Sequence, residues 1–283
     1  LTAQAYGAGD ADELRAGLGR TLILAGVLGL SLILLQAPIG SVAFHLVDAS
    51  HQVERFAGTY FTIRIWSAPF ALTNYAVLGW LLGTQRAGHA LLLQVFLNGV
   101  NIVLDLLFVV GLGYAIAGVA AASLIAEIAA AVLGLGLCLH LLRKEGGRFS
   151  RARLLAREHL VRLFRVNRDI FLRTLCLIFA FATFTAQGAR LGETILAANA
   201  ILMQLQNILA FGLDGFAHAA EILVGGAVGA RNRVAFRRAV KTATIWAAGV
   251  ALAFSGVLAL AGPGIVGLFT DIEAVRLTAF AYL

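Results

Sequence analysis

Charged side chains are scarce in this chain, and their scarcity excludes an ordinary soluble domain. Only 13% of the 283 residues are Asp, Glu, Lys or Arg, while 60% are hydrophobic; soluble domains carry roughly 25% charged residues. Long stretches lack all four charged residue types, and each could cross about 30 Å of hydrocarbon as a helix. These stretches are 21–46, 65–85, 106–126, 194–213 and 242–270. The composition therefore predicts a membrane protein.

The chain has only two cysteines, and it lacks the sequence patterns that hold metals or nucleotides. The two cysteines, Cys138 and Cys176, lie far apart in apolar sequence without metal or redox spacing. This favours two buried thiols that act as small hydrophobic side chains. Since no Ser/His/Asp set, phosphate loop or zinc pattern is found either, the sequence predicts neither an enzyme nor a bound cofactor or metal. No ten-residue segments of strict alternation indicate β-barrel strands.

The apolar pattern predicts an all-α polytopic membrane protein. The expected spans are 18–46, 54–84, 88–112, 115–142, 169–190, 193–229 and 236–268, with the tail of a helix at 1–6 and the start of another near 273. Basic residues gather in alternate loops, whereas the loops between them hold few. By the positive-inside rule the basic loops face the cytoplasm, and we expect a multi-pass protein of the inner (plasma) membrane.

The longest basic loop is predicted to connect two lobes. Residues 143–168 contain nine Lys or Arg residues that alternate with leucine, valine and phenylalanine. Such charge could suggest a nucleic-acid site, but its place between spans favours an amphipathic helix on the membrane surface. The expected organisation is an N-terminal lobe at 1–142, a basic cytoplasmic connector at 143–168 and a C-terminal lobe at 169–283.

The chain contains an internal repeat at an offset of 222 residues. Residues 1–15 align with 223–237, and Val53, Ala57 and Tyr60 align with Val275, Ala279 and Tyr282. Six predicted spans separate the two copies, and an even number leaves both copies in the same orientation. This predicts two parallel six-helix repeats related by an axis along the membrane normal. A protein of about twelve transmembrane helices is expected, of which this chain is an interior fragment running from the end of helix 2 to the start of helix 10.

A polar stripe interrupts the apolar span 88–112. Gln94, Asn98, Asn101 and Asp105 lie within about 60° of one another on a helix. Polar groups at this depth are expected only where they face a bundle interior or a water-filled cavity. We therefore predict that Asp105 takes up and releases a proton and that Asn101 is its hydrogen-bond partner, with Asn74 facing the same cavity. The alternative is a carboxylate neutralised by a fixed structural partner.

A second polar set lies in the span 193–229. Asn207, Asp214, His218 and Glu221 share one face of a helix, among small residues that suit close helix packing. The pattern favours a cavity or gating network of the C-terminal lobe over a purely structural cluster. Two acids around a histidine could also hold a metal, but no other residue supplies ligands.

Two further charges lie within predicted spans. The long stem of Arg64 can carry its guanidinium to the nearer membrane surface, so an anchoring role is expected. Glu127 lies among alanines, and a partner across the bundle or a role in the cavity are equally compatible with the sequence.

Several stretches together resemble the multidrug and toxic compound extrusion (MATE) transporters, within them the DinF-like branch. They are AYGAGD at 5–10, ADELRAGLGR at 11–20, YFTIRIWSAPF at 60–70, VLGWLLGTQ at 77–85, NGVNIVLDLLFVVGLGYAIAGVAAASLIAE at 98–127 and GLDGFAHAAEILVGGAVGARN at 212–232. The resemblance implies a twelve-helix, two-lobe antiporter that exchanges organic compounds for protons or sodium by alternating access. It also implies that Asn101 and Asp105 lie near an acidic residue of the first helix, which is outside this chain.

The sequence thus predicts a secondary active exporter of cationic or lipophilic organic compounds, driven by inward flow of H+ or Na+. The expected partners are a small organic substrate and the lipid bilayer, without nucleic acid, and the expected state is a monomer. The alternative is a polyisoprenoid-lipid flippase of related two-lobe architecture. Such flippases usually show several basic residues facing the cavity, whereas the spans here contain only Arg64, with Arg55 and Arg173 near their ends.

Overall fold

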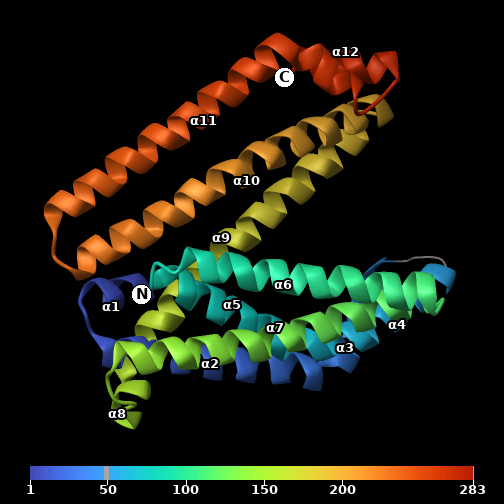
Figure 1. The fold of residues 1–283 in the computed structure, drawn as a ribbon. Coiled ribbons are helices and arrows are strands. Elements are labelled where there is room, and N and C mark those ends of the chain that lie inside the picture. Colours follow the sequence, from blue (N-terminus) through green and yellow to red (C-terminus); the bar gives the residue numbers. More distant parts are fainter. Residues whose placement is uncertain (48–50, 283) are drawn as a thin grey trace. The chain divides into compact units, whose positions relative to one another are not determined.

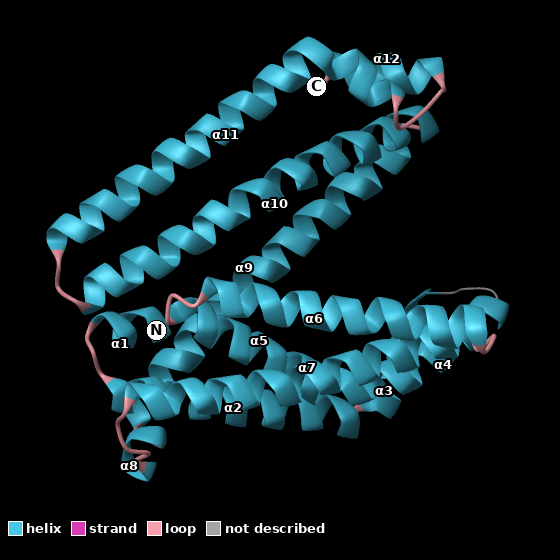
Figure 2. Ribbon diagram, in the orientation of Figure 1, coloured by secondary structure: helices cyan, strands magenta, loops and turns pink. Residues whose placement is uncertain are grey.

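The computed structural model describes residues 1–47 and 51–282, and every regular element in those ranges is a helix (Figure 1, Figure 2). The elements are α1 (Thr2–Gly7), α2 (Ala11–Leu34), α3 (Gln36–Val47), α4 (His51–Arg64), η1 (Ile65–Ser67), α5 (Ala68–Gly83), α6 (Ala87–Asp105), η2 (Leu106–Gly111), α7 (Ala115–Glu145), α8 (Arg151–Leu154), α9 (Arg157–Arg190), α10 (Glu193–Gly229), α11 (Arg233–Gly267) and α12 (Glu273–Ala281). Seven helical segments of the described residues are long and apolar enough to cross a membrane. The prediction of a multi-pass, all-helical membrane protein is confirmed.

The chain divides into two compact units. The first contains Leu1–Ala156 with Val228–Arg231, and the second contains Arg157–Ala227 with Asn232–Leu283. The division after Ala156 falls inside the predicted connector 143–168, and the lobe boundaries at 142 and 169 remain predictions. The connector is not one helix: it comprises the end of α7, an extended stretch at 146–150, the short α8 and the first turns of α9. The span expected at 169–190 is therefore part of a longer helix that begins at Arg157.

The first unit is built on α7, against which α4, α5 and α6 pack, while α2 packs on α5 (Figure 1). Small residues on α7 permit this close approach: a Cβ added at Gly134 would lie 2.9 Å from Val77 and 3.0 Å from Leu93. Trp80 and Cys138 complete the buried core, and the Trp80 indole donates to the carbonyl of Leu14 at 3.2 Å. The core thus holds α5, α6 and α7 at fixed registers.

The expectation of two buried thiols is correct for only one cysteine. Cys138 is fully buried in the core around α7, where burial suits a small apolar side chain. Cys176 is exposed on α9, because nearly all of that helix is uncovered by the described residues. The second unit has a smaller core, formed where α10, α11 and α12 meet around Ile201, Val266 and Val275.

The α4–η1–α5 span is interrupted in its middle. The 3₁₀ turn η1 follows Arg64, and Pro69 lies in the first turn of α5, where its missing N–H costs no helical hydrogen bond. α2 approaches this point closely, since a Cβ at Gly29 would lie 2.4 Å from the Cα of Pro69. The interruption therefore lies within the packed bundle, where it positions the charged end of α4.

The same helix-to-helix turn occurs twice at an offset of 222 residues. Gly9 and Arg231 both adopt left-handed backbone angles, with φ of 67° and 52°. The N–H groups of Asp10 and Asn232 each donate to the carbonyl five residues earlier, at 3.0 and 2.9 Å, as in a Schellman motif. Both side chains then cap the following helix by accepting from its first N–H groups. The backbone thus repeats at the offset at which the sequence repeats.

Candidate functional site

The polar stripe of α6 is divided between a packed edge and an open edge. Asn101 and Asp105 are half-buried beside α7, whereas Gln94 and Asn98 are exposed. The amide of Gln94 donates to the Asn98 side chain at 3.5 Å, the upper limit for a hydrogen bond. The stripe therefore leads from an exposed surface to a half-buried carboxylate along one helix.

Asn101 does not bind Asp105, contrary to the prediction. Its side-chain N–H donates instead to the hydroxyl of Ser123 on α7, at 3.2 Å. The reason is that α7 packs closely against α6, so a partner on the neighbouring helix is within reach. Sequence reasoning missed Ser123, although it is the only hydroxyl-bearing residue in the alanine-rich helix α7.

Asp105 carries an unsatisfied oxygen. Its Oδ1 is buried and has no hydrogen-bond partner among the described residues. Such groups are rare because burial without a partner costs about 1–3 kcal/mol. The π-helical turn η2 starts at the next residue, and π-turns inside helices are frequent at functional sites. Protonation of the carboxyl group or binding of a small cation would neutralise the charge at this oxygen, so Asp105 is compatible with the coupling ion expected from the sequence.

Asn74 belongs to a different cluster from Asp105. It is 4% exposed, and its side-chain N–H groups donate to Glu127 on α7, at 3.0 Å to the main-chain oxygen and 2.6 Å to Oε2. The structure thus brings Asn74 to Glu127 and not to the polar stripe, because its side of α5 packs on α7. The predicted place of Asn74 in a cavity with Asp105 stays a prediction.

Arg64 is paired and does not extend freely to a membrane surface. Its guanidinium lies 3.4 Å from Oε1 of Glu127 and also donates to the Ser67 hydroxyl. The anchoring role expected for Arg64 is therefore replaced by an ion pair within the bundle. Of the two roles left open for Glu127, the structure shows the partner across the bundle.

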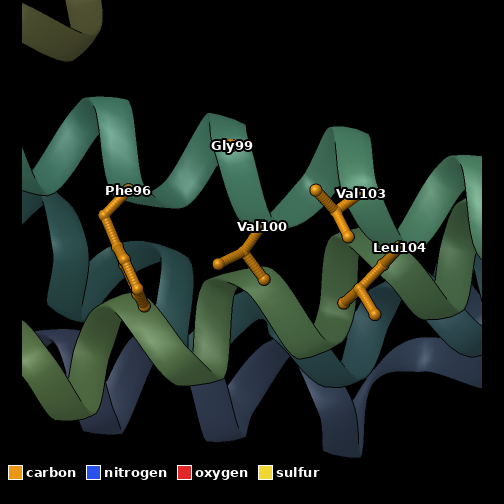
Figure 3. A pocket seen from close by; sticks show the side chains of 5 residues that line it. All are labelled: Phe96, Gly99, Val100, Val103 and Leu104. Atoms are coloured by element: carbon orange, nitrogen blue, oxygen red, sulfur yellow. The ribbon is translucent and has the colours of Figure 1, made fainter.

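Away from the stripe, on roughly the opposite face of α6, lies a shallow apolar groove. Figure 3 shows its lining residues, Phe96, Gly99, Val100, Val103 and Leu104, which enclose about 350 Å³. Phe96, Val100 and Leu104 extend toward the neighbouring helix α7 (Figure 3). Because no polar side chain lines it, the groove suits hydrocarbon and offers no ligand to an ion.

The polar set of the second unit is exposed. Asn207, Asp214, His218 and Glu221 all lie on uncovered faces of α10. Only His218 and Glu221 approach each other, with Nδ1 3.7 Å from Oε2. Within residues 1–47 and 51–282 no three His, Cys, Asp or Glu side chains are grouped to hold a metal ion. A cavity or gating role for this set remains a prediction.

Comparison with known proteins agrees with this architecture. The MatE family model matches residues 1–107 and 170–283. Among curated proteins, the DNA damage-inducible protein F of Escherichia coli K12 is 41% identical over the whole chain, which spans 62% of its length. The probable multidrug resistance protein NorM of Caulobacter vibrioides is 26% identical over 84% of the chain and 52% of its own length.

Solved structures share the fold. An outward-facing multidrug resistance MATE family transporter superposes with a TM-score of 0.82 at 23% identity, over 99% of this chain and 65% of that structure. A MOP superfamily transporter from Pyrococcus furiosus gives 0.81 at 22% identity, over 99% and 66%. The chain thus spans about two thirds or less of these proteins. The family match over both units, with seven helices able to span a membrane, shows that this chain is a multi-pass membrane protein of the MATE family.

Proposed function

We propose that the protein is a secondary active exporter of small organic compounds, driven by inward movement of H+ or Na+ through alternating access. The observation that carries this proposal is the buried, partnerless Oδ1 of Asp105 within a membrane span. A carboxylate at this depth is costly unless an ion neutralises it. A site that binds and releases such an ion is what coupling requires.

Asp105 is the ion-binding residue in this proposal, and its neighbours give it access and position. Gln94 and Asn98 are exposed on the same stripe and line the aqueous path to the carboxylate. Asn101 is held by Ser123 at 3.2 Å, so its orientation does not depend on the state of Asp105. Binding a proton or sodium ion removes the net charge, and this biases the bundle toward one of two packings.

Two parallel six-helix lobes are part of the proposal. The recurrence of one turn and its helix cap at an offset of 222 residues supports a duplicated half. In such transporters the substrate site lies between repeats that move relative to each other. We assign Asn207, Asp214, His218 and Glu221 to the cavity of the C-terminal lobe, and we expect a monomer in the inner (plasma) membrane.

The flippase alternative is weakened by the state of Arg64. A lipid pyrophosphate requires free cationic side chains, but Arg64 is held by Glu127 and Ser67. The relatives named for multidrug resistance also favour small organic substrates. The transported compounds are therefore proposed to be cationic or lipophilic, and the protein acts on them by transport and not by catalysis.

Reconstitution in vesicles tests this function. We expect vesicles that contain the intact protein to accumulate ethidium when a pH gradient is imposed. If sodium is the coupling ion, a Na+ gradient should drive the same accumulation. Asp105→Asn should abolish gradient-driven uptake while the protein stays folded and inserted. Asp271→Asn makes the same change in an exposed loop and should transport normally. Uptake by Asp105→Asn at the wild-type rate would mean that the coupling residue lies elsewhere.

A further inference from the structure

A polar network inside the first unit connects the interrupted span to α7. At its centre, Glu127 accepts from Asn74 and pairs with Arg64. Arg64 is the last residue of α4, and the hydroxyl of Ser67 in η1 donates back to the Arg64 carbonyl at 2.7 Å. The network thus ties α4, η1 and α5 to a single residue of α7.

The network is half-buried at its ion pair and fully buried at Asn74, and its hydrogen bonds are directional. The side chains of Arg64 and Glu127 are 31% and 14% exposed. Both N–H groups of Asn74 are used on Glu127, which fixes the amide and leaves Asn74 Oδ1 buried without a partner among the described residues. A buried ion pair is often no more stabilising than apolar side chains of the same size. The pair instead constrains the geometry, because Glu127 can contact both Arg64 and Asn74 in only one register of the helices.

This geometry extends to the ion site through one turn of α7 and one turn of α6. Ser123 precedes Glu127 by one helical turn on the same helix, and residues four apart share a helix face. Ser123 in turn accepts from Asn101, which precedes Asp105 by one turn on α6. A shift of α7 along its axis would therefore move Ser123 away from Asn101.

We propose that Glu127 is a positioning residue: held by Arg64 and Asn74, it sets the register of α7 against the interrupted span and keeps Ser123 within hydrogen-bond reach of Asn101 beside Asp105. The consequence for ion coupling rests on the function proposed above. The register itself does not, and it can be measured without transport.

A disulfide between the two helices reports the register. In the intact protein with Cys138 and Cys176 replaced by alanine, N101C/S123C should cross-link readily on mild oxidation. Adding Glu127→Ala or Arg64→Ala should slow cross-linking by about tenfold, a coupling of ordinary size for residues in one network. The charge reversal R64E/E127R should restore most of the rate. Asp169→Ala, which breaks the exposed pair with Arg168, is the matched control and should leave the rate unchanged.

A second variant keeps the test decisive if Glu127→Ala does not fold. Glu127→Gln retains an acceptor for Asn74, adds a donor for Asn74 Oδ1 and removes the charge that holds Arg64. We expect a folded protein that cross-links more slowly than N101C/S123C alone. If Glu127→Gln and Arg64→Ala both cross-link at the rate of N101C/S123C alone, the positioning role is overturned. If cross-linking behaves as expected but the wild type shows no gradient-driven uptake, the transport proposal fails and the positioning role stands.

Discussion

Replacing Asp105 by asparagine should stabilise the protein even as it removes function. The buried Oδ1 has no partner among the described residues, and a buried unsatisfied group costs about 1–3 kcal/mol, more when it is charged. Asparagine keeps the shape and removes the charge. Asn101 loses nothing, because its amide donates to Ser123. We therefore expect a gain of about 1 kcal/mol or more in the free energy of unfolding, as is common when functional residues are replaced.

Thermal unfolding of the purified intact protein in detergent measures this gain. A stabilisation of 1 kcal/mol raises Tm by about 2–4 °C in a chain of 150–250 residues, so a rise of at least about 2 °C is expected for Asp105→Asn at neutral pH. Asp271→Asn, in an exposed loop, should leave Tm unchanged. A fall of several degrees for Asp105→Asn would show that the carboxylate has a structural partner, and the reasoning from its unsatisfied oxygen would be refuted.

Three further predictions concern the backbone of the first unit and Asp10, the residue that caps α2. Gln85 is exposed with φ of 60°, so Gln85→Gly should raise the free energy of unfolding by about 0.5–1 kcal/mol, and the same unfolding assay should show no rise if the turn is unstrained. Gly29→Ala places a Cβ 2.4 Å from the Pro69 Cα and should cost about 1–3 kcal/mol as an overpacked contact; an unchanged Tm would contradict that close approach. The N–H of Glu13, despite some opposing desolvation, and then the Arg153 side chain lower the pKa of Asp10. A lowered folded-state pKa stabilises the fold fully above the unfolded value of about 3.9 and loses this effect as pH falls through the folded-state pKa. The stability lost in Asp10→Asn should therefore be constant above about pH 5 and shrink at lower pH, and a pH-independent difference would exclude the Asp10 charge as its cause.

The helices could be predicted from the sequence because lipid imposes length and composition on them. Residues 115–142 are uncharged for most of their length, and α7 spans Ala115–Glu145. The break at η1 escaped prediction, since a proline in the first turn of a helix and a proline within an apolar span look alike in sequence. The connector also differs from the separate segment expected at 143–168. From Arg157 onward nothing interrupts α9, so the last basic residues of the connector and the following span lie in one helix.

The candidate site was predictable in composition but not in pairing. Helical spacing places Asn101 one turn from Asp105. It cannot show that Ser123 of the neighbouring helix lies where the Asn101 amide can donate to it. Arg64 and Glu127 are 63 residues apart, and only the packing of α4 on α7 brings them together. Face and periodicity are local properties, whereas partners depend on which helices touch.

Ion release on substrate binding tests most directly whether Asp105 carries the coupling ion. Ethidium is added to the purified intact protein in weakly buffered, mildly acidic solution containing a pH indicator, and protons released per protein are counted. If Asp105 carries the ion, release is stoichiometric from the wild type and from Asp271→Asn, and absent from Asp105→Asn. If sodium is the coupling ion, displacement of bound Na+ replaces the proton signal and depends on Asp105 in the same way. Equal release of either ion from Asp105→Asn and the wild type would contradict the claim.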